Sequence, residues 1–251
     1  MIPITTHRPI KQEIANTGYS RVFANNIPLT TKLKSAWETL LADYQSLPPD
    51  NHLPDNGLYR YRRYDKFAFH PATGKLQVLP HEDYFQSTDI NHVTGGIVRK
   101  FAPLTPETIA NPFLHALIRF DFAQFPLADP AYADDMWQVD VHQIHVIADV
   151  GSEAHPTPEG VHRDGASFVT VHLAVRENAD GGIVSIYDDD KQHLTSFQLE
   201  NILDSYLFND SILWHGVKPI RSADNEQPAQ RGILTFDFHH KPQLEMPSND
   251  K

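Results

Sequence analysis

The sequence predicts a mainly β chain with flanking helices, built as an antiparallel sandwich or jelly roll. From residue 136 onward, short segments rich in β-branched and aromatic residues follow one another, separated by Gly, Asp, Asn and Pro. No long helical period lies between them, which argues against a βαβ fold. Helical patterns appear only before residue 136. We therefore expect helices to lie outside a core of strands.

The first helix is expected over residues 29–47. Thr30 or Thr31 is suited to cap its beginning, and Pro48-Pro49 stops it. Apolar residues recur at helical spacing along this segment, at Leu33, Trp37, Leu40, Leu41, Tyr44 and Leu47.

A second helical region is expected from Thr105-Pro106-Glu107, which places Pro at the first helical position. Asn111-Pro112 restarts it, and apolar residues follow at Phe113, Leu117 and Phe120. Between the two helical regions, residues 58–98 are rich in aromatic and β-branched residues interrupted by turn signals. We expect short strands there that pack beside the main sheets.

Strands dominate the second half of the chain. They are expected at residues 136–150, 167–175, 181–188, 194–199, 211–220 and 231–239. We predict a single domain over residues 1–251. Residues 1–135 form a helical and strand support region, residues 136–241 form the jelly-roll core, and residues 242–251 form a tail.

The composition restricts the chemistry that the chain can perform. It has 251 residues and no cysteine. A chain of this length buries roughly 70–75% of its unfolded surface, so its stability requires no disulfide or structural metal. Without cysteine, disulfides, Cys-zinc sites, thiolate iron–sulfur clusters and Cys nucleophiles are excluded. The side chains available to bind a metal are those of His, Asp and Glu.

The formal net charge of -11 disfavours a nucleic-acid partner, since the phosphate backbone would be repelled. The basic cluster Arg60-Tyr-Arg-Arg63 is typical of a solvated edge or a small-anion site. The N-terminus has no basic segment followed by an apolar one, and no window approaches the roughly 18 apolar residues of a membrane span. We expect a cytoplasmic protein without nucleic-acid or membrane partners, and the sequence predicts no particular oligomeric state.

A candidate metal site begins in the stretch EGVHRDGASF. In extended geometry His162 and Asp164 point to the same face, although this spacing is common by chance and a polar turn is the alternative. His215 supplies a further ligand type inside the apolar segment LWHGVKP. Two His and one carboxylate on one face, with the opposite positions open, is the arrangement of non-heme Fe(II) oxygenases.

Arg231 heads the otherwise apolar segment RGILTFDF. If its side chain points inward it needs an anionic partner, because an unpaired buried charge is very costly. A dicarboxylate co-substrate would supply one for the guanidinium fork. A non-catalytic jelly-roll protein that binds zinc or no metal is the alternative, and it has no need for an inward Arg.

The order His162-x-Asp164, His215, Arg231 resembles the Fe(II)/2-oxoglutarate-dependent dioxygenases of the double-stranded β-helix fold, a cupin-like jelly roll. The flanking strings EGVHRDGASFVTVHLAV, GGIVSIYD, LWHGVKPI and YFQSTDINHVTGGIVRKFAPL are similar to the bacterial amino-acid hydroxylase branch typified by L-isoleucine 4-hydroxylase. The likeness covers the chain from about residue 58 to residue 238.

This resemblance implies roles for four residues. His162, Asp164 and His215 would bind Fe(II) as the catalytic centre, and Arg231 would pair with the distal carboxylate of 2-oxoglutarate. The remaining iron positions would take 2-oxoglutarate and O2, and the reaction would hydroxylate a C–H bond with release of succinate and CO2. The presence of Asp164 favours hydroxylation over halogenation.

Further site residues are expected near the co-substrate and the substrate. Around 2-oxoglutarate the candidates are Gln143, His145, Thr170 and Thr235, each of which would otherwise be an ordinary polar strand residue. For an amino-acid substrate, Arg99 or Arg163 would bind the carboxylate, and Asp65 or Glu159 the ammonium group. The expected substrate is a free, aliphatic L-amino acid; a peptide, a protein side chain or another small metabolite is the alternative.

Other polar features are expected to be structural. His142 and His145 lie three apart in a strand pattern, so they should point to opposite faces. His172 and His239-His240 are expected to be surface or hydrogen-bonded sheet residues. The acidic run at residues 188–190 is typical of a solvated turn, and Gly181-Gly182 precedes a strand rather than a phosphate-binding helix.

Overall fold

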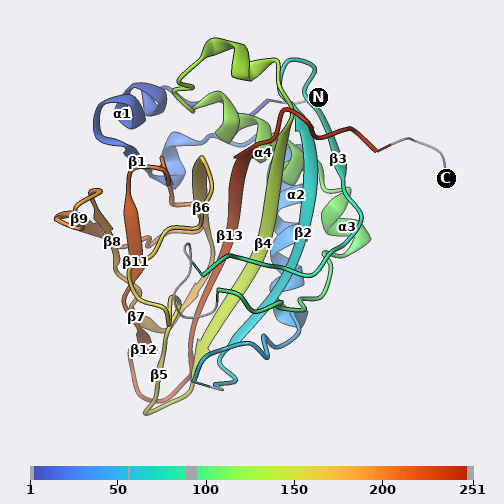
Figure 1. Cartoon of the computed structure of the whole chain (residues 1–251). Coiled ribbons are helices and arrows are strands. Elements are labelled where there is room, and N and C mark those ends of the chain that lie inside the picture. Colours follow the sequence, from blue (N-terminus) through green and yellow to red (C-terminus); the bar gives the residue numbers. More distant parts are fainter. Residues whose placement is uncertain (1–2, 56, 89–94, 248–251) are drawn as a thin grey trace.

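Two layers of antiparallel strands form the core of the computed structural model, which describes residues 3–55, 57–88 and 95–247. The larger layer is a seven-stranded sheet in the order β1-β10-β6-β13-β4-β2-β3 (Figure 1). The smaller layer consists of two three-stranded sheets, β11-β8-β9 and β5-β12-β7. The predicted jelly-roll fold with flanking helices is confirmed.

The strands are β1 (Tyr19–Val22), β2 (Arg60–His70), β3 (Lys75–Val78), β4 (Trp137–Ala148), β5 (Glu153–Ala154), β6 (Phe168–Glu177), β7 (Ala179–Gly181), β8 (Val184–Tyr187), β9 (His193–Phe197), β10 (Ser205–Phe208), β11 (Trp214–Val217), β12 (Ile220–Ser222) and β13 (Ala229–His240). The α-helices are α1 (Ile10–Thr17), α2 (Thr31–Ala42), α3 (Pro106–Ile109) and α4 (Pro112–Ala123). Short 3-10 turns are η1 (Ala24–Asn26), η2 (Asp43–Ser46) and η3 (Pro130–Ala133).

Strand β13 shows how the main sheet separates two environments. Side chains at alternate positions of a strand point to opposite faces. Arg231, Ile233, Thr235 and Asp237 line a pocket between the two layers of strands. The intervening residues Leu234, Phe236 and Phe238 are buried in the main hydrophobic core, together with residues of α2 and α4. One strand therefore carries both the wall of the pocket and the anchor for the helices.

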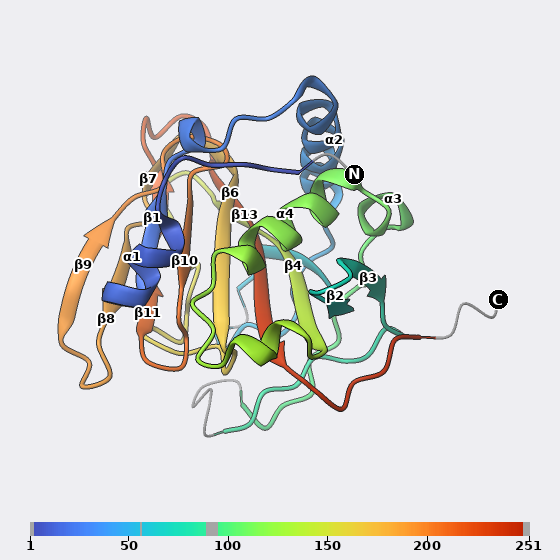
Figure 2. The ribbon, with the colours of Figure 1, turned by 90° about the horizontal axis from the view of Figure 1, so that it is seen from above.

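The helices α2 and α4 cover the outer face of the main sheet. In Figure 1 α2 lies behind β4 and β2, and Figure 2 shows α4 running across β13 and β4. The hydroxyl of Thr30 caps α2 by accepting from the N–H of Leu33 at 3.4 Å. Asn111 caps α4 by accepting from the N–H of Phe113 at 2.8 Å. The first predicted helix is confirmed, with its last turn in the 3-10 form.

The region between the predicted helices differs from expectation. Residues 60–70 form one strand of 11 residues, β2, which pairs with β4 inside the main sheet instead of packing beside it.

Strand β10 was not predicted, because its four residues are all buried and show no alternation of polar and apolar side chains. Residues 89–94 of the predicted strand region, and residues 248–251 of the predicted tail, lie outside the described residues.

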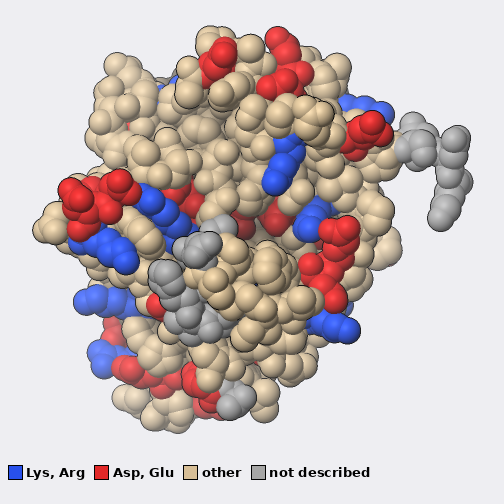
Figure 3. All heavy atoms as spheres, in the orientation of Figure 1, with Lys and Arg blue, Asp and Glu red and all other residues tan. Residues whose placement is uncertain are grey.

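The surface carries charges of both signs. Figure 3 shows blue and red side chains interspersed over the face seen in Figure 1, with acidic side chains gathered over the β8–β9 turn at the left. Each helix within the described ranges is too short or too polar to cross a lipid bilayer. The acidic run at residues 188–190 lies in that exposed turn, as its sequence predicts.

Candidate metal centre and its pocket

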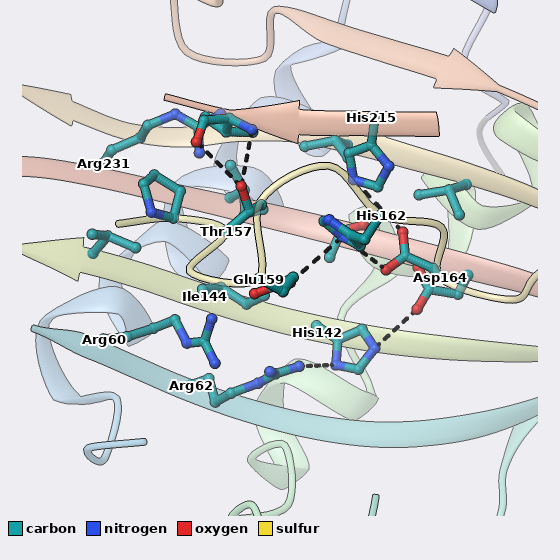
Figure 4. A pocket seen from close by; sticks show the side chains of 18 of the residues that line it. Arg60, Arg62, His142, Ile144, Thr157, Glu159, His162, Asp164, His215 and Arg231 are labelled. Atoms are coloured by element: carbon teal, nitrogen blue, oxygen red, sulfur yellow. Dashed lines mark hydrogen bonds and ion pairs between the residues drawn. The ribbon is translucent and has the colours of Figure 1, made fainter. Parts of the chain in front are cut away.

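A pocket lies between the two layers of strands. Its walls come from β2, β4, β6, β10, β11 and β13, from the segment 156–164 that follows β5, and from Tyr84, Gln86 and Arg99 in the region between β3 and α3. Figure 4 shows the labelled side chains converging on this space from both layers. The pocket thus collects residues that are far apart in the sequence.

His162, Asp164 and His215 meet at one end of the pocket, as the sequence predicts (Figure 4). Backbone hydrogen bonds join the two histidines, with the N–H of His162 donating at 2.8 Å and that of His215 at 2.9 Å. The possible ligand atoms of the three side chains lie within 4.8 Å of one another. The Nε2 atoms of His162 and His215 are 3.5 and 3.7 Å from the Asp164 carboxylate. This geometry suits a single metal ion held by three side chains.

A backbone contact orients the side chain of His162. The Nδ1 of His162 lies 3.0 Å from the carbonyl oxygen of Gly160. A proton on Nδ1 would donate there and leave the lone pair of Nε2 facing Asp164. Burial lowers the pKa of His162, but Glu159 and Asp164 outweigh this and raise it to about 10. The centre therefore attracts positive charge, as a divalent cation site should.

Asp210 holds the turn that follows the candidate ligand Asp164. Its carboxylate accepts from the backbone N–H groups of Asp164 at 3.0 Å, Gly165 at 2.8 Å and Ala166 at 3.0 Å. Gly165 has a φ of +82°, a conformation that glycine adopts without strain. Asp210 is only 1% exposed, so these bonds are shielded from water. The sequence contained no obvious signal for this role, because Asp210 lies far downstream of the turn.

Arg231 points into the pocket on the side of β13. It is almost completely buried, and its Nε and one terminal nitrogen have no hydrogen-bond partner among the described residues. Gly182 makes room for it, since a Cβ at that position would lie 3.1 Å from the Cδ of Arg231. A buried guanidinium without a carboxylate is costly, so an anionic ligand is the partner that this site fits. The side chain of Arg231 thus points inward, which is the condition on which the sequence argument for an anionic partner depends.

Three of the expected co-substrate residues lie on the wrong face of the sheet, which corrects those expectations. His142, Ile144 and Val146 of β4 line the pocket. By the alternation of the strand, Gln143 and His145 face the helices, where His145 Nδ1 lies 3.1 Å from a backbone oxygen of the η2 turn. The predicted opposite orientation of the two histidines is thereby confirmed.

Thr170 is likewise turned toward the helices. Its hydroxyl donates to Asp121 of α4 at 2.8 Å, and His172 contacts the same carboxylate at 2.8 Å. All three side chains are fully buried, which makes this cluster an internal tie between α4 and β6. Thr235 does line the pocket, and its hydroxyl donates to the carbonyl of Thr170 at 2.8 Å.

The structure divides the expected substrate residues into two groups. Arg99 and Glu159 line the pocket, and Glu159 lies 3.6 Å from the Nε2 of His162. Asp65 is engaged elsewhere, by His81 at 2.7 Å and by a backbone N–H at 2.8 Å, and this corrects its expected place near the substrate. Arg163 points away from the centre.

Arg163 instead contacts the turn between β8 and β9 and the first residue of β11. Its guanidinium bonds Asp189 at 2.6 Å and lies over the ring of Trp214 at 4.6 Å. This orientation follows from its position between two inward residues of an extended segment. Arg163 is therefore removed from the residues able to contact a molecule in the pocket.

The sequence did not predict the role of the basic cluster on β2. Arg60 and Arg62 line the pocket and are buried, so the solvated-edge alternative is wrong. Arg60 bonds Asp50 at 2.8 Å, and Arg62 contacts the Nδ1 of His142 at 2.7 Å. Their spacing of two residues in a strand was the available signal, because it places both on one face.

Comparison with known proteins gives consistent similarities. A family model described as 2OG-Fe dioxygenase matches residues 41–237. The chain is 28% identical over 203 residues to 3(1)-hydroxy-L-isoleucine 4-dioxygenase of Pantoea ananatis, covering 80% of each chain. It is 26% identical to L-isoleucine-4-hydroxylase of Bacillus thuringiensis, covering 79% of this chain and 81% of that one. The crystal structure of a BsmA homologue from Methylobium petroleophilum is similar, with a TM-score of 0.81 and 27% identity over 98% of this chain and 97% of the other.

Proposed function

Because the chain belongs to the 2OG-Fe dioxygenase family, an enzyme family that uses Fe(II), 2-oxoglutarate and O2, we propose that it hydroxylates a free, aliphatic L-amino acid. The observation that carries this proposal is the combination of two sites in one pocket. The cluster of His162, Asp164 and His215 suits one metal ion, and Arg231 offers a buried guanidinium to a dicarboxylate. A protein that only binds a metal has no use for the second site.

We assign the roles as follows. His162, Asp164 and His215 hold Fe(II), and Arg231 holds the distal carboxylate of 2-oxoglutarate. Bound Fe(II) with 2-oxoglutarate and O2 supplies the oxidant that converts a C–H bond into C–OH, with succinate and CO2 as co-products. The chain orients the reactants in a pocket that lies between the two layers of strands. Asp210 keeps the Asp164 turn in place through three backbone hydrogen bonds.

The pocket also supports the proposed substrate class. Its walls include the aliphatic side chains of Ile144, Val146, Val217 and Ile233, which suit an apolar side chain. Glu159 is our candidate to receive the ammonium group, since it lies in the pocket beside His162. The two relatives named above act, by their names, on isoleucine or a hydroxylated isoleucine. A free amino acid is therefore the substrate that the pocket and the relatives favour together.

A mass-spectrometric screen tests this proposal. Purified protein with Fe(II), ascorbate and 2-oxoglutarate is incubated with each proteinogenic amino acid, and products that gain one oxygen are measured beside succinate. We expect an aliphatic amino acid to give both, and neither to form without 2-oxoglutarate. Turnover of peptides but not of any free amino acid would overturn the substrate class. If neither the amino acids nor the peptides led to succinate formation, the proposed reaction would be overturned.

The metal assignment has its own control. His162→Ala should abolish detectable Mn(II) binding, measured by calorimetry in the absence of O2, because one of three ligands is removed. His193 is a matched control, since it lies exposed on β9 outside the pocket. His193→Ala should bind Mn(II) as the wild type does. Equal affinity in His162→Ala would contradict the ligand assignment.

A further inference from the structure

Besides Arg231, a pair of guanidinium groups lies in another part of the pocket. Arg62 on β2 and Arg99 both line the pocket and are 6% and 5% exposed. Figure 4 places Arg62 and Arg231 on opposite sides of the pocket. The distance along the sheet agrees, because β4 separates β2 from β13. The co-substrate partner proposed above and this pair are therefore separate features.

The two guanidinium groups pack against the same two aromatic rings, those of Tyr84 and Phe101. The guanidinium carbon of Arg62 is 4.0 Å from the ring centre of Phe101 and 5.8 Å from that of Tyr84. The corresponding distances for Arg99 are 5.7 and 4.6 Å. Contacts of a cation with an aromatic face stabilise the charge without neutralising it. The two rings thus contact two positive charges and do not neutralise either of them.

Among the described residues, no carboxylate lies closer than 4.0 Å to either guanidinium group of this pair. The carboxylate of Asp50 lies 4.0 Å from Arg62, but it is bonded more closely, at 2.8 Å, to Arg60. The hydrogen bond of Arg99 at 2.7 Å goes to the neutral amide oxygen of Gln86. The Nε atoms of Arg62 and Arg99 are buried and have no hydrogen-bond partner within the described ranges. Because buried cations require compensation, an anionic group of the ligand is expected between them.

Two neutral side chains, His142 and Gln86, orient the guanidinium groups of Arg62 and Arg99. A guanidinium only donates, so His142 must accept from Arg62 through Nδ1 and carry its proton on Nε2, which lies 3.2 Å from Asp237. The amide of Gln86 accepts from Arg99 and donates to the backbone oxygen of Asp164 at 3.1 Å. Gln86 therefore connects Arg99 to the turn that carries a proposed iron ligand.

We propose that Arg62 and Arg99 together bind the free α-carboxylate of the substrate, with His142 and Gln86 as their positioning residues. This inference rests on the proposed function and makes it more specific. The ionised carboxylate fills the space between two guanidinium groups, so that the side chain of the substrate extends toward the metal centre. An amino-acid amide, or an interior residue of a peptide, leaves both cations unpaired and is rejected.

The first test needs no variant. L-Isoleucine and L-isoleucinamide, or the corresponding pair for the best substrate in the screen, are titrated by calorimetry into wild-type protein loaded with Mn(II) and 2-oxoglutarate. We expect the acid to bind about 100-fold more tightly than the amide, as for the loss of a charged hydrogen-bonding partner. Equal affinity for acid and amide would overturn the carboxylate clamp and leave the proposed hydroxylation intact.

The second test uses Arg62→Gln and Arg99→Gln, with Arg221→Gln as the matched control because Arg221 lies exposed in a surface pair with Asp180. Each pocket variant should raise the KM for the amino acid by about 100-fold and lose most of the preference for the acid over the amide. The KM for 2-oxoglutarate should stay within about twofold of wild type, as should all constants of Arg221→Gln.

A positioning residue should act differently from the clamp itself. Gln86→Leu is expected to lower the acid preference about tenfold and to raise the ratio of succinate to hydroxylated product, because the substrate is held less firmly before the metal. Unchanged acid preference in Arg62→Gln and Arg99→Gln contradicts the clamp, even when the enzyme hydroxylates the amino acid. Absence of both binding and turnover in the wild type contradicts the proposed function instead. Where a Gln variant does not fold, Arg62→Lys or Arg99→Lys replaces it; because the charge is kept and only the fork is lost, the preference for the acid should fall below that of wild type without disappearing, and an unchanged preference contradicts the clamp.

Discussion

The carboxylate of Asp210 offers a way to separate the stability of the fold from the integrity of the metal site. It accepts three backbone hydrogen bonds, from residues 164 to 166, at distances between 2.8 and 3.1 Å. Asp210→Asn keeps the size of the side chain but removes its charge and replaces one acceptor oxygen with a donor. The N–H of Asp164 then faces another donor. We expect the turn to loosen.

The magnitude follows from the bonds lost. Hydrogen bonds to a charged acceptor contribute about 1.5–3 kcal/mol each, and neutral ones about 0.5–1.5 kcal/mol. Weakening three such bonds by about 1 kcal/mol each gives a loss of about 3 kcal/mol, which corresponds to a fall in Tm of roughly 6–12 °C for a chain of this size. Because the turn carries a proposed ligand, Mn(II) affinity should also fall, by about 10- to 100-fold.

Asp204 provides a matched control in the same chain. It too is 1% exposed and accepts from three backbone N–H groups, those of Ala24, Glu200 and Asn201, at 2.9 to 3.1 Å. Asp204→Asn should therefore lower the Tm by a similar amount while Mn(II) affinity stays at the wild-type value. Calorimetric Mn(II) titrations, carried out well below the lowest Tm, compare the two variants. Wild-type affinity in Asp210→Asn, or an equal loss in both variants, would refute the reasoning.

Three further predictions concern other parts of the molecule. Arg231→Gln should raise the KM for 2-oxoglutarate about 100-fold and leave Mn(II) affinity unchanged, because a carboxylate loses its charged partner; steady-state kinetics with varied co-substrate measures this. Tyr44→Phe should lower the free energy of unfolding by about 1–2 kcal/mol in urea titrations, since its buried hydroxyl donates to a backbone oxygen of β13 at 2.8 Å. Burial raises the pKa of Asp50, but Arg62 and Arg60 outweigh it and hold that pKa below its usual value. The stabilising contribution of Asp50 is therefore present above about pH 4 and lost as the pH falls further, so the stability difference between wild type and Asp50→Asn should shrink below pH 4.

The sequence predicted those site residues whose chemistry contrasts with their surroundings. Arg231 heads an apolar strand, and His215 interrupts one, so each required an explanation beyond packing. His162 and Asp164 gained meaning from the two downstream residues. The strand spacing indicated that the chain near His162 would meet His215, which it does through an isolated β-bridge, but not that Asp210 would hold the turn that carries Asp164.

The remaining errors have a common physical origin in strand register. Whether His142 or Gln143 faces the pocket depends on the pairing of β4 with β2 and β13, and a shift of one residue exchanges the two faces. This pairing is set by contacts between distant segments, which local patterns do not contain. For Arg60 and Arg62 the sequence left a solvated edge and a small-anion site open, because a buried strand face that carries arginines has the same composition as one covered by water.

The alternation along β13 has a consequence for how the substrate range of such an enzyme can change over evolution or in a directed-evolution library. Leu234, Phe236 and Phe238 anchor the helices, whereas Ile233 on the other face belongs to the pocket wall. Mutations at Ile233 and at Ile144, its partner on β4, can therefore reshape the cavity while the anchoring residues preserve the scaffold. The substrate range can therefore change by mutations in this strand without loss of stability, because selection for a new substrate and selection for a folded protein act on different residues.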